Sequence, residues 1–248
     1  MKTYKGIVYF WLGTMLQIGI ICCLIAVLKF NKINYNKIAE LTFLAIGGLS
    51  SAIWGFIISR KTGRVKQYIQ IVKDFFNMKQ SFKYYCMTVL FLMIIIIKQL
   101  VYGEMRDNIK WYTFFLLFVQ SLLFGGVEEI GWRYTFQPML EKYMPFEIAS
   151  MVTFFSWAIW HYMYFYLVGA FGNLSNVPFL LMLLSSSFIL GAIYYISGSL
   201  WLCVIYHALL NTFSQTLMMT SLLQTIITTV ICIFLSIILV RRCPRVRC

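Results

Sequence analysis

Long apolar stretches alternate with short polar segments along the whole chain, and this pattern predicts a bundle of membrane-spanning helices. A spanning helix needs about 20 mostly apolar residues, because the hydrocarbon core is about 30 Å thick and a helix rises about 1.5 Å per residue. Eight stretches approach this length, at residues 7–28, 38–58, 84–97 (extended to 101), 111–129, 146–167, 177–196, 200–219 and 222–240. We therefore expect an all-α, polytopic helical bundle with about eight transmembrane helices, built as a single membrane domain over residues 1–248.

Composition excludes a water-soluble domain of ordinary type. Hydrophobic residues make up 61% of the 248 residues and charged residues 12%, whereas soluble domains have roughly 45–50% and about 25%. The first apolar stretch is longer than the core of a signal peptide, about 7–15 residues, and no small-x-small cleavage site follows it, so we expect a retained helix. Very short turns join the last three stretches, which predicts that these are antiparallel neighbours.

The net charge of +13 does not indicate nucleic acid as a partner, because the basic residues lie in loops and tails. They cluster at residues 2–5, 60–83 and 241–247. With eight spans all three clusters fall on one side of the bilayer, which predicts a cell-membrane protein with both termini in the cytoplasm. Residues 29–37 are a mild exception. Residues 65–82 mix apolar and basic positions, which fits either an amphipathic helix on the membrane surface or a solvated loop.

A charged group, Glu128, Glu129 and Arg133, ends the fourth stretch. Residues four apart share a helix face, so Glu129 and Arg133 are placed to form an ion pair. Glu128 points away from that pair, and a buried carboxylate without a cation of its own is suited to act as a general base. The alternative is that both glutamates end the helix among the lipid headgroups. Burial of Glu128 requires the helix to continue toward Leu140, or the following segment to dip into the bundle.

The two histidines of the chain both lie inside apolar stretches. His161 follows Trp157 by one helical turn, and His207 shares a helix face with Asn211. Neighbouring donors of this kind can hold an oxyanion or contribute to a metal site. The alternatives are that His161 lies at the membrane–water interface, and that His207 and Asn211 only form hydrogen bonds between helices. Because polar groups inside a membrane are costly and usually mark function, we favour a functional role for the set.

The order of these motifs, EExxxR, then aromatic-xxx-His, then HxxxN, resembles the CPBP family of intramembrane proteases. This family is also called Abi or CAAX-protease-like and includes the Ras-converting CAAX endopeptidases. The three motifs begin at Glu128, Trp157 and His207, with tryptophan where phenylalanine is more usual. They span about 118–213, two fifths of the chain, within a motif-bearing core of about 111–219.

The resemblance implies an endopeptidase that cleaves membrane-associated peptide or protein substrates. The resemblance also implies that Glu128 activates a water with help from His161, and that His207 and Asn211 form the oxyanion hole. Glu129 and Arg133 are then supporting residues. The resemblance favours a reaction without a cofactor. A zinc site made of His161, His207 and a carboxylate is the other reading that the residues allow.

Two non-enzymatic readings use the same polar cluster. A proton-coupled transporter would use Glu128 and the histidines as a relay, but such proteins usually contain an internal repeat, which this sequence lacks. An immunity or scaffold protein would bind its partner without cleaving it. The complete set of motifs favours catalysis. The sequence gives no oligomeric state and no physiological substrate.

Overall fold

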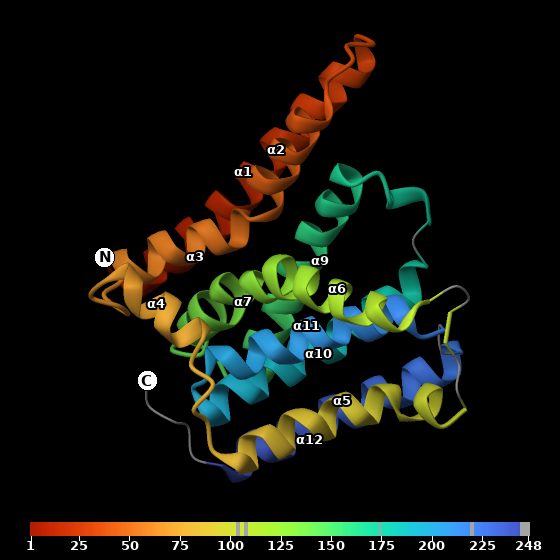
Figure 1. Cartoon of the computed structure of the whole chain (residues 1–248). Helices are drawn as coiled ribbons and strands as arrows, with labels where there is room; N and C mark the ends of the chain where they lie inside the picture. Colours follow the sequence, from red (N-terminus) through yellow and green to blue (C-terminus); the bar gives the residue numbers. More distant parts are fainter. Residues whose placement is uncertain (103–104, 107–108, 174, 219–220, 244–248) are drawn as a thin grey trace.

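The computed structural model describes residues 1–102, 105–106, 109–173, 175–218 and 221–243, and its regular elements are all helices (Figure 1). The expected all-α fold is therefore confirmed. Three residues of the predicted stretches and basic tail, Met219, Arg245 and Arg247, lie outside the described residues. The elements are α1 (Thr3–Phe30), α2 (Lys37–Gly48), α3 (Ser50–Lys61), α4 (Tyr68–Phe75), α5 (Phe82–Tyr102), α6 (Trp111–Ser121), η1 (Leu122–Gly126), α7 (Val127–Gly131), η2 (Trp132–Phe136), α8 (Gln137–Leu140), α9 (Phe146–Leu167), η3 (Phe171–Asn173), α10 (Asn176–Ser197), α11 (Leu200–Thr216) and α12 (Leu222–Arg242).

Each of the eight predicted apolar stretches contains helix in the structure. Five helical segments are long and apolar enough to cross a bilayer, namely α1, α5, the run Trp111–Leu140, α10 and α12. The bent pair α2 and α3 makes a sixth if it counts as one span. The chain is thus a multi-pass membrane protein. Its total of eight crossings, which would add α9 and α11, stays a prediction.

The second predicted stretch, residues 38–58, is a bent helix pair in the structure. Its two halves, α2 and α3, meet at Leu49 and are bent by 44° relative to each other. The pair Gly47 and Gly48 stands directly before the bend, and adjacent glycines weaken a helix because they lose the most conformational freedom on folding. The same glycines let α9 approach, since a Cβ at Gly47 would lie 2.6 Å from Leu167.

The basic region 65–82 contains the short helix α4. Ile71 and Phe75 on one side of α4 are buried, whereas the polar Gln70 and Lys73 are exposed. This arrangement confirms an amphipathic helix in that region, and its placement on the membrane surface stays a prediction.

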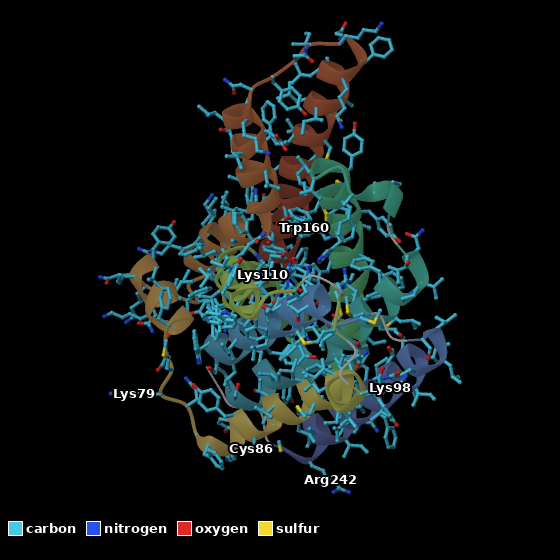
Figure 2. All side chains as sticks on the ribbon, turned by 45° about the vertical axis from the view of Figure 1, so that its right-hand side comes forward. Lys79, Cys86, Lys98, Lys110, Trp160 and Arg242 are labelled. Carbon is cyan, nitrogen blue, oxygen red and sulfur yellow. The ribbon has the colours of Figure 1, made fainter. Side chains whose placement is uncertain are left out.

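The helices that carry the three motifs are packed at the centre of the bundle. In Figure 1 the run from α6 to α8 lies against α11, α1 and α3 cover it on one side, and α5 and α12 lie on the opposite side. Helix α10 packs against both α11 and α12. Trp132, Trp157 and Trp160 are among the largest fully buried side chains, and Figure 2 shows Trp160 inside the bundle while Lys79 and Arg242 lie at its periphery. The site is therefore built on buried elements at the centre of the bundle.

Candidate active site

The helix that carries Glu128 and Glu129 is continuous but irregular. It runs from Trp111 to Leu140, and the two π-helical turns η1 and η2 flank the five residues of α7. Single π-turns inside α-helices are frequent at functional sites, because each one changes the direction in which the next side chains point. The continuation to Leu140 that burial of Glu128 required is thus present, and Pro138 is accommodated at the start of α8.

Helix α3 holds α7 in place by direct backbone contact. A Cβ on Gly131 would lie 2.4 Å from the carbonyl oxygen of Ser51, and a Cβ on Gly55 would lie 2.7 Å from that of Ile130. Real Cβ atoms do not approach backbone oxygens so closely, so only glycine fits at both positions. The backbone between Glu129 and Trp132 is therefore locked against α3.

Glu128 is buried, with 8% of its surface exposed, and its carboxylate is oriented by α9. The indole Nε1–H of Trp157 donates to Oε2 of Glu128 over 2.8 Å. The structure thus places Glu128 inside the bundle and not among headgroups at a helix end. No hydrogen bond links Glu128 to Arg133 among the described residues, as the sequence predicted.

His161 lies one turn after Trp157 in an aromatic environment. Its Nδ1 is 3.0 Å from the carbonyl oxygen of Trp157. A carbonyl can only accept, so this bond assigns the proton to Nδ1 and leaves a lone pair on Nε2. The rings of Trp157, Trp160 and Phe179 lie 5.0–5.4 Å from the imidazole, centroid to centroid. His161 can accordingly accept a proton at Nε2.

Glu129, Arg133 and His207 form a buried charged cluster. Oε1 of Glu129 accepts from Nη1 of Arg133 at 3.4 Å and lies 2.7 Å from Nδ1 of His207. Glu129 and Arg133 are fully buried, and His207 is 4% exposed. The Arg133 guanidinium also lies 4.0 Å from the centre of the Trp157 ring, a cation–π distance. The predicted pair of Glu129 and Arg133 is confirmed, and His207 joins it from α11.

The side-chain nitrogens of His207 and Asn211 converge beside Gly125 in η1. A Cβ at Gly125 would lie 2.6 Å from Nδ2 of Asn211 and 3.2 Å from Nε2 of His207. Both nitrogens thus lie close to one point on the backbone of the helix that carries Glu128. Donors that converge in this way are suited to hold a negatively charged oxygen.

The donor set for a metal ion is not assembled. Among the described residues, no group of three or more histidine, cysteine, aspartate and glutamate side chains is arranged to hold a metal ion. His207 and Glu129 approach each other, but both are already engaged in the cluster with Arg133. The zinc site of His161, His207 and a carboxylate stays an untested alternative.

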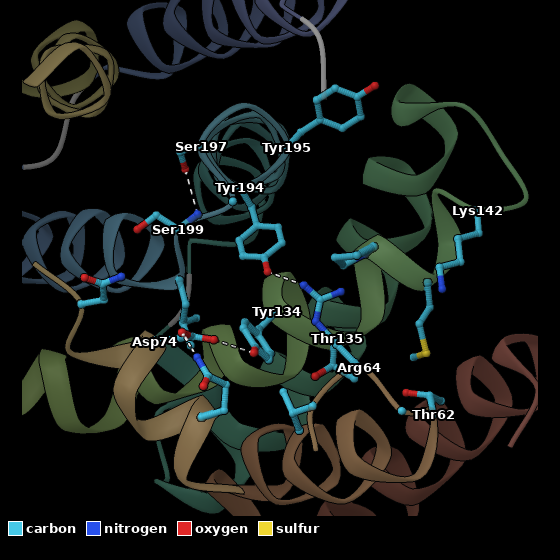
Figure 3. Close-up of a pocket in the computed structure, with 18 of the residues that line it drawn as sticks. Thr62, Arg64, Asp74, Tyr134, Thr135, Lys142, Tyr194, Tyr195, Ser197 and Ser199 are labelled. Carbon is cyan, nitrogen blue, oxygen red and sulfur yellow. Dashed lines mark hydrogen bonds between the residues drawn. The ribbon is translucent and has the colours of Figure 1, made fainter. Parts of the chain in front are cut away.

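A large polar cavity lies apart from these residues. It has a volume of about 950 Å³ and opens between the loop 62–65, α4, η2, α8 and α10. Figure 3 shows Arg64, Tyr134, Asp74 and Tyr194 around it. These side chains form hydrogen bonds with one another: Arg64 donates to the Tyr194 hydroxyl, and Tyr134 donates to Asp74 over 2.7 Å. None of the six motif residues lines this cavity.

All six predicted residues gather in one region. Two further residues, Trp157 and Gly125, contribute to the site, and the sequence analysis did not assign them a role. Trp157 entered only as an aromatic of the motif, whereas its indole reaches Glu128, Arg133 and His161. The sequence feature that could have revealed this role is an indole N–H group, at Trp157, one helical turn before the buried His161. Gly125 was also missed, although a glycine inside a helical apolar stretch signals a close approach.

Residues 110–213 match the family model described as Type II CAAX prenyl endopeptidase Rce1-like. The matched part begins just before α6 and ends within α11, so it contains all six motif residues. The resemblance inferred from the three motifs is thereby confirmed over this part of the chain. No curated protein matches the chain.

Proposed function

We propose that this Rce1-like membrane protein hydrolyses peptide bonds of membrane-associated peptides or proteins, with Glu128 as the base that activates a water. The observation that carries the proposal is the buried Glu128 carboxylate, oriented by the Trp157 indole within the matched region. One carboxylate oxygen accepts from Trp157, which leaves the other for a water. The substrate would meet this group inside the bundle, because Glu128 is buried there.

In the proposed reaction Glu128 and His161 share the task of removing a proton from the water. Nε2 of His161 carries the lone pair, because Nδ1 donates to the Trp157 carbonyl. The water oxygen attacks the carbonyl carbon of the scissile peptide bond, and Glu128 accepts the proton. The same proton then passes to the leaving amine, as in other general acid–base hydrolyses.

His207 and Asn211 would stabilise the oxyanion of the tetrahedral intermediate. Asn211 contributes an amide N–H, and His207 contributes Nε2. Nδ1 of His207 faces Glu129 at 2.7 Å, so Nε2 donates only if His207 carries protons on both ring nitrogens. The carboxylate of Glu129 compensates the charge of that imidazolium. In this way Glu129 and Arg133 support the oxyanion hole without touching the substrate.

Gly125→Ala tests the oxyanion hole without removing either donor. The new methyl group would displace Nδ2 of Asn211, the far end of a side chain that can move. We expect the kcat for peptide cleavage to fall by about a hundredfold, because misplacing one oxyanion donor costs about as much as losing it. Peptide cleavage by the purified variant and by the wild-type protein provides the comparison.

Gly126→Ala is the matched control. Its methyl group would lie 2.9 Å from Cγ1 of Val204 and meets neither donor. This variant is expected to melt at a lower temperature than the wild-type protein but to retain its kcat. Equal losses of kcat in both variants would contradict the role of Asn211.

The experiment that tests the function as a whole is cleavage of membrane-anchored peptides by purified, detergent-solubilised protein, with and without a chelator. We propose a reaction without a resident metal, supported by the absence of a three-ligand cluster among the described side chains. Cleavage is expected to survive chelation. Loss of cleavage on chelation, restored by zinc, would refute the metal-free reaction, and no cleavage of any peptide would favour a scaffold or transporter.

A further inference from the structure

A small apolar pocket adjoins the candidate active site. Its volume is about 310 Å³, and it lies between α5, α10, α11 and α12. Its size is at the lower end of the range for ligand pockets, roughly 300–1,000 Å³. It therefore suits one or two amino-acid residues better than a long chain. The walls are mostly apolar and include Ile95, Ile96, Phe179, Met182, Leu210 and Phe213.

Three of these lining residues lie close to the candidate reacting groups. The ring of Phe179 lines the pocket and lies 5.4 Å from the His161 ring, centroid to centroid. Leu210 directly precedes Asn211, and Phe213 follows it by two residues on α11. A chain segment that fills the pocket would thus continue toward His161 and Asn211.

Gln99 is the buried amide in a lining whose other polar side chains include Arg106, Ser185, Thr228 and Thr229. Gln99 is 4% exposed, lines the pocket, and its Oε1 has no hydrogen-bond partner within the described part of the chain. An unsatisfied buried amide destabilises a protein unless something else supplies the bond. A hydrocarbon chain in the pocket would leave Gln99 unsatisfied, whereas the N–H of a peptide group would satisfy it.

We propose that this pocket binds an apolar side chain of the peptide substrate, and that Gln99 bonds the backbone amide beside that side chain. The proposal rests on the proposed function, since it assigns the pocket to the same substrate. It makes Gln99 a specificity-determining residue that distinguishes a peptide from a lipid chain. The nearby apolar walls then select large hydrophobic residues next to the cleaved bond.

The test measures binding, so that it does not depend on cleavage. Fluorescein-labelled nonapeptides of leucine, phenylalanine and alanine are titrated in detergent against the Glu128→Gln protein, with fluorescence anisotropy as the readout. Gln99→Leu is added to this protein, and each backbone amide of the peptide is methylated in turn. Gln67→Leu, at an exposed position on α4's N-terminal side, is the matched control.

Gln99→Leu is expected to weaken peptide binding about fivefold, as is methylation of one particular amide, because each change removes the same hydrogen bond. Combined, the two changes should cost no more than either alone, whereas Gln67→Leu should change nothing. The proposal is overturned if Gln99→Leu binds the peptide as tightly as its parent, if the two losses multiply at every amide, or if no peptide binds. Melting temperatures confirm that the variants are folded.

Binding and cleavage separate this proposal from the preceding one. Peptides that bind with the expected pattern but are never cleaved by the wild-type protein would refute the protease and leave the pocket standing. Cleavage by the wild-type protein together with unchanged peptide binding by the Gln99→Leu variant would support the protease and refute the role of Gln99 in the pocket.

Discussion

Replacing Glu128 with glutamine is expected to lower the kcat for peptide cleavage by roughly a thousandfold, within the range that general bases contribute. The glutamine carbonyl can still accept from Nε1 of Trp157, so the packing around position 128 is preserved. It cannot accept a proton from water at neutral pH. The KM should change little, because the base contacts the water and not the substrate side chains. Steady-state cleavage by detergent-solubilised protein gives both constants.

Glu147→Gln is the matched control for this experiment. Glu147 lies in the first turn of α9 and pairs with Arg241 at the surface, over 2.8 Å. Removing its charge should leave the kcat within about twofold of the wild-type value, because a surface ion pair contributes little to the fold. A Glu128→Gln protein that kept a tenth or more of the wild-type kcat would show that another group activates the water.

Arg133→Leu is expected to destabilise the protein by about 3–5 kcal/mol, the usual cost of stranding one member of a buried ion pair. The change leaves the Glu129 carboxylate buried with only His207 as partner. It also removes the cation from the face of Trp157. We expect an apparent melting temperature lower by roughly 10 °C for a protein of this size, measured by the intrinsic fluorescence of the detergent-solubilised protein.

A second substitution makes this prediction specific to charge. Adding Glu129→Gln to Arg133→Leu removes the stranded carboxylate, so the double variant should recover much of the lost melting temperature. Arg241→Leu breaks an ion pair whose arginine is 72% exposed and should shift melting by about 1 °C or less. If Arg241→Leu and Arg133→Leu were equally harmful, burial of the charged cluster would not explain the effect.

The pattern of apolar stretches was sufficient to predict the helical elements, because lipid requires helices to satisfy their own backbone groups. It could not predict the bend at Leu49 or the two π-turns. Both depend on packing against distant segments, such as α9 against Gly47 and α3 against Gly131. Periodicity along one helix contains no information about such neighbours. The number of crossings also stays a prediction. It depends on whether α9 and α11, which pack inside the bundle, cross the bilayer as well.

The candidate site was predictable in its members but not in its connections. The i, i+4 spacing correctly placed Glu129 with Arg133, because both residues lie on one helix. Spacing could not reveal that His207 from α11 joins Glu129, nor that Trp157 bonds Glu128, because those contacts cross between helices. Gln99 was visible only as one amide in an apolar stretch. Its relation to Phe179 and to the pocket depends on how α5 and α10 pack.

The two π-turns also constrain how this segment can change in length. Each holds one residue more than a regular helix would need, so deleting that residue would close the widened turn and leave the helix beyond it in nearly the same orientation. A deletion in α7, which has no extra residue, would instead rotate everything beyond it by about 100° and turn Tyr134 away from Asp74. Deletions in α7 should therefore be as damaging as loss of the candidate catalytic side chains, while the exposed turn at residues 168–169 after α9 should tolerate them.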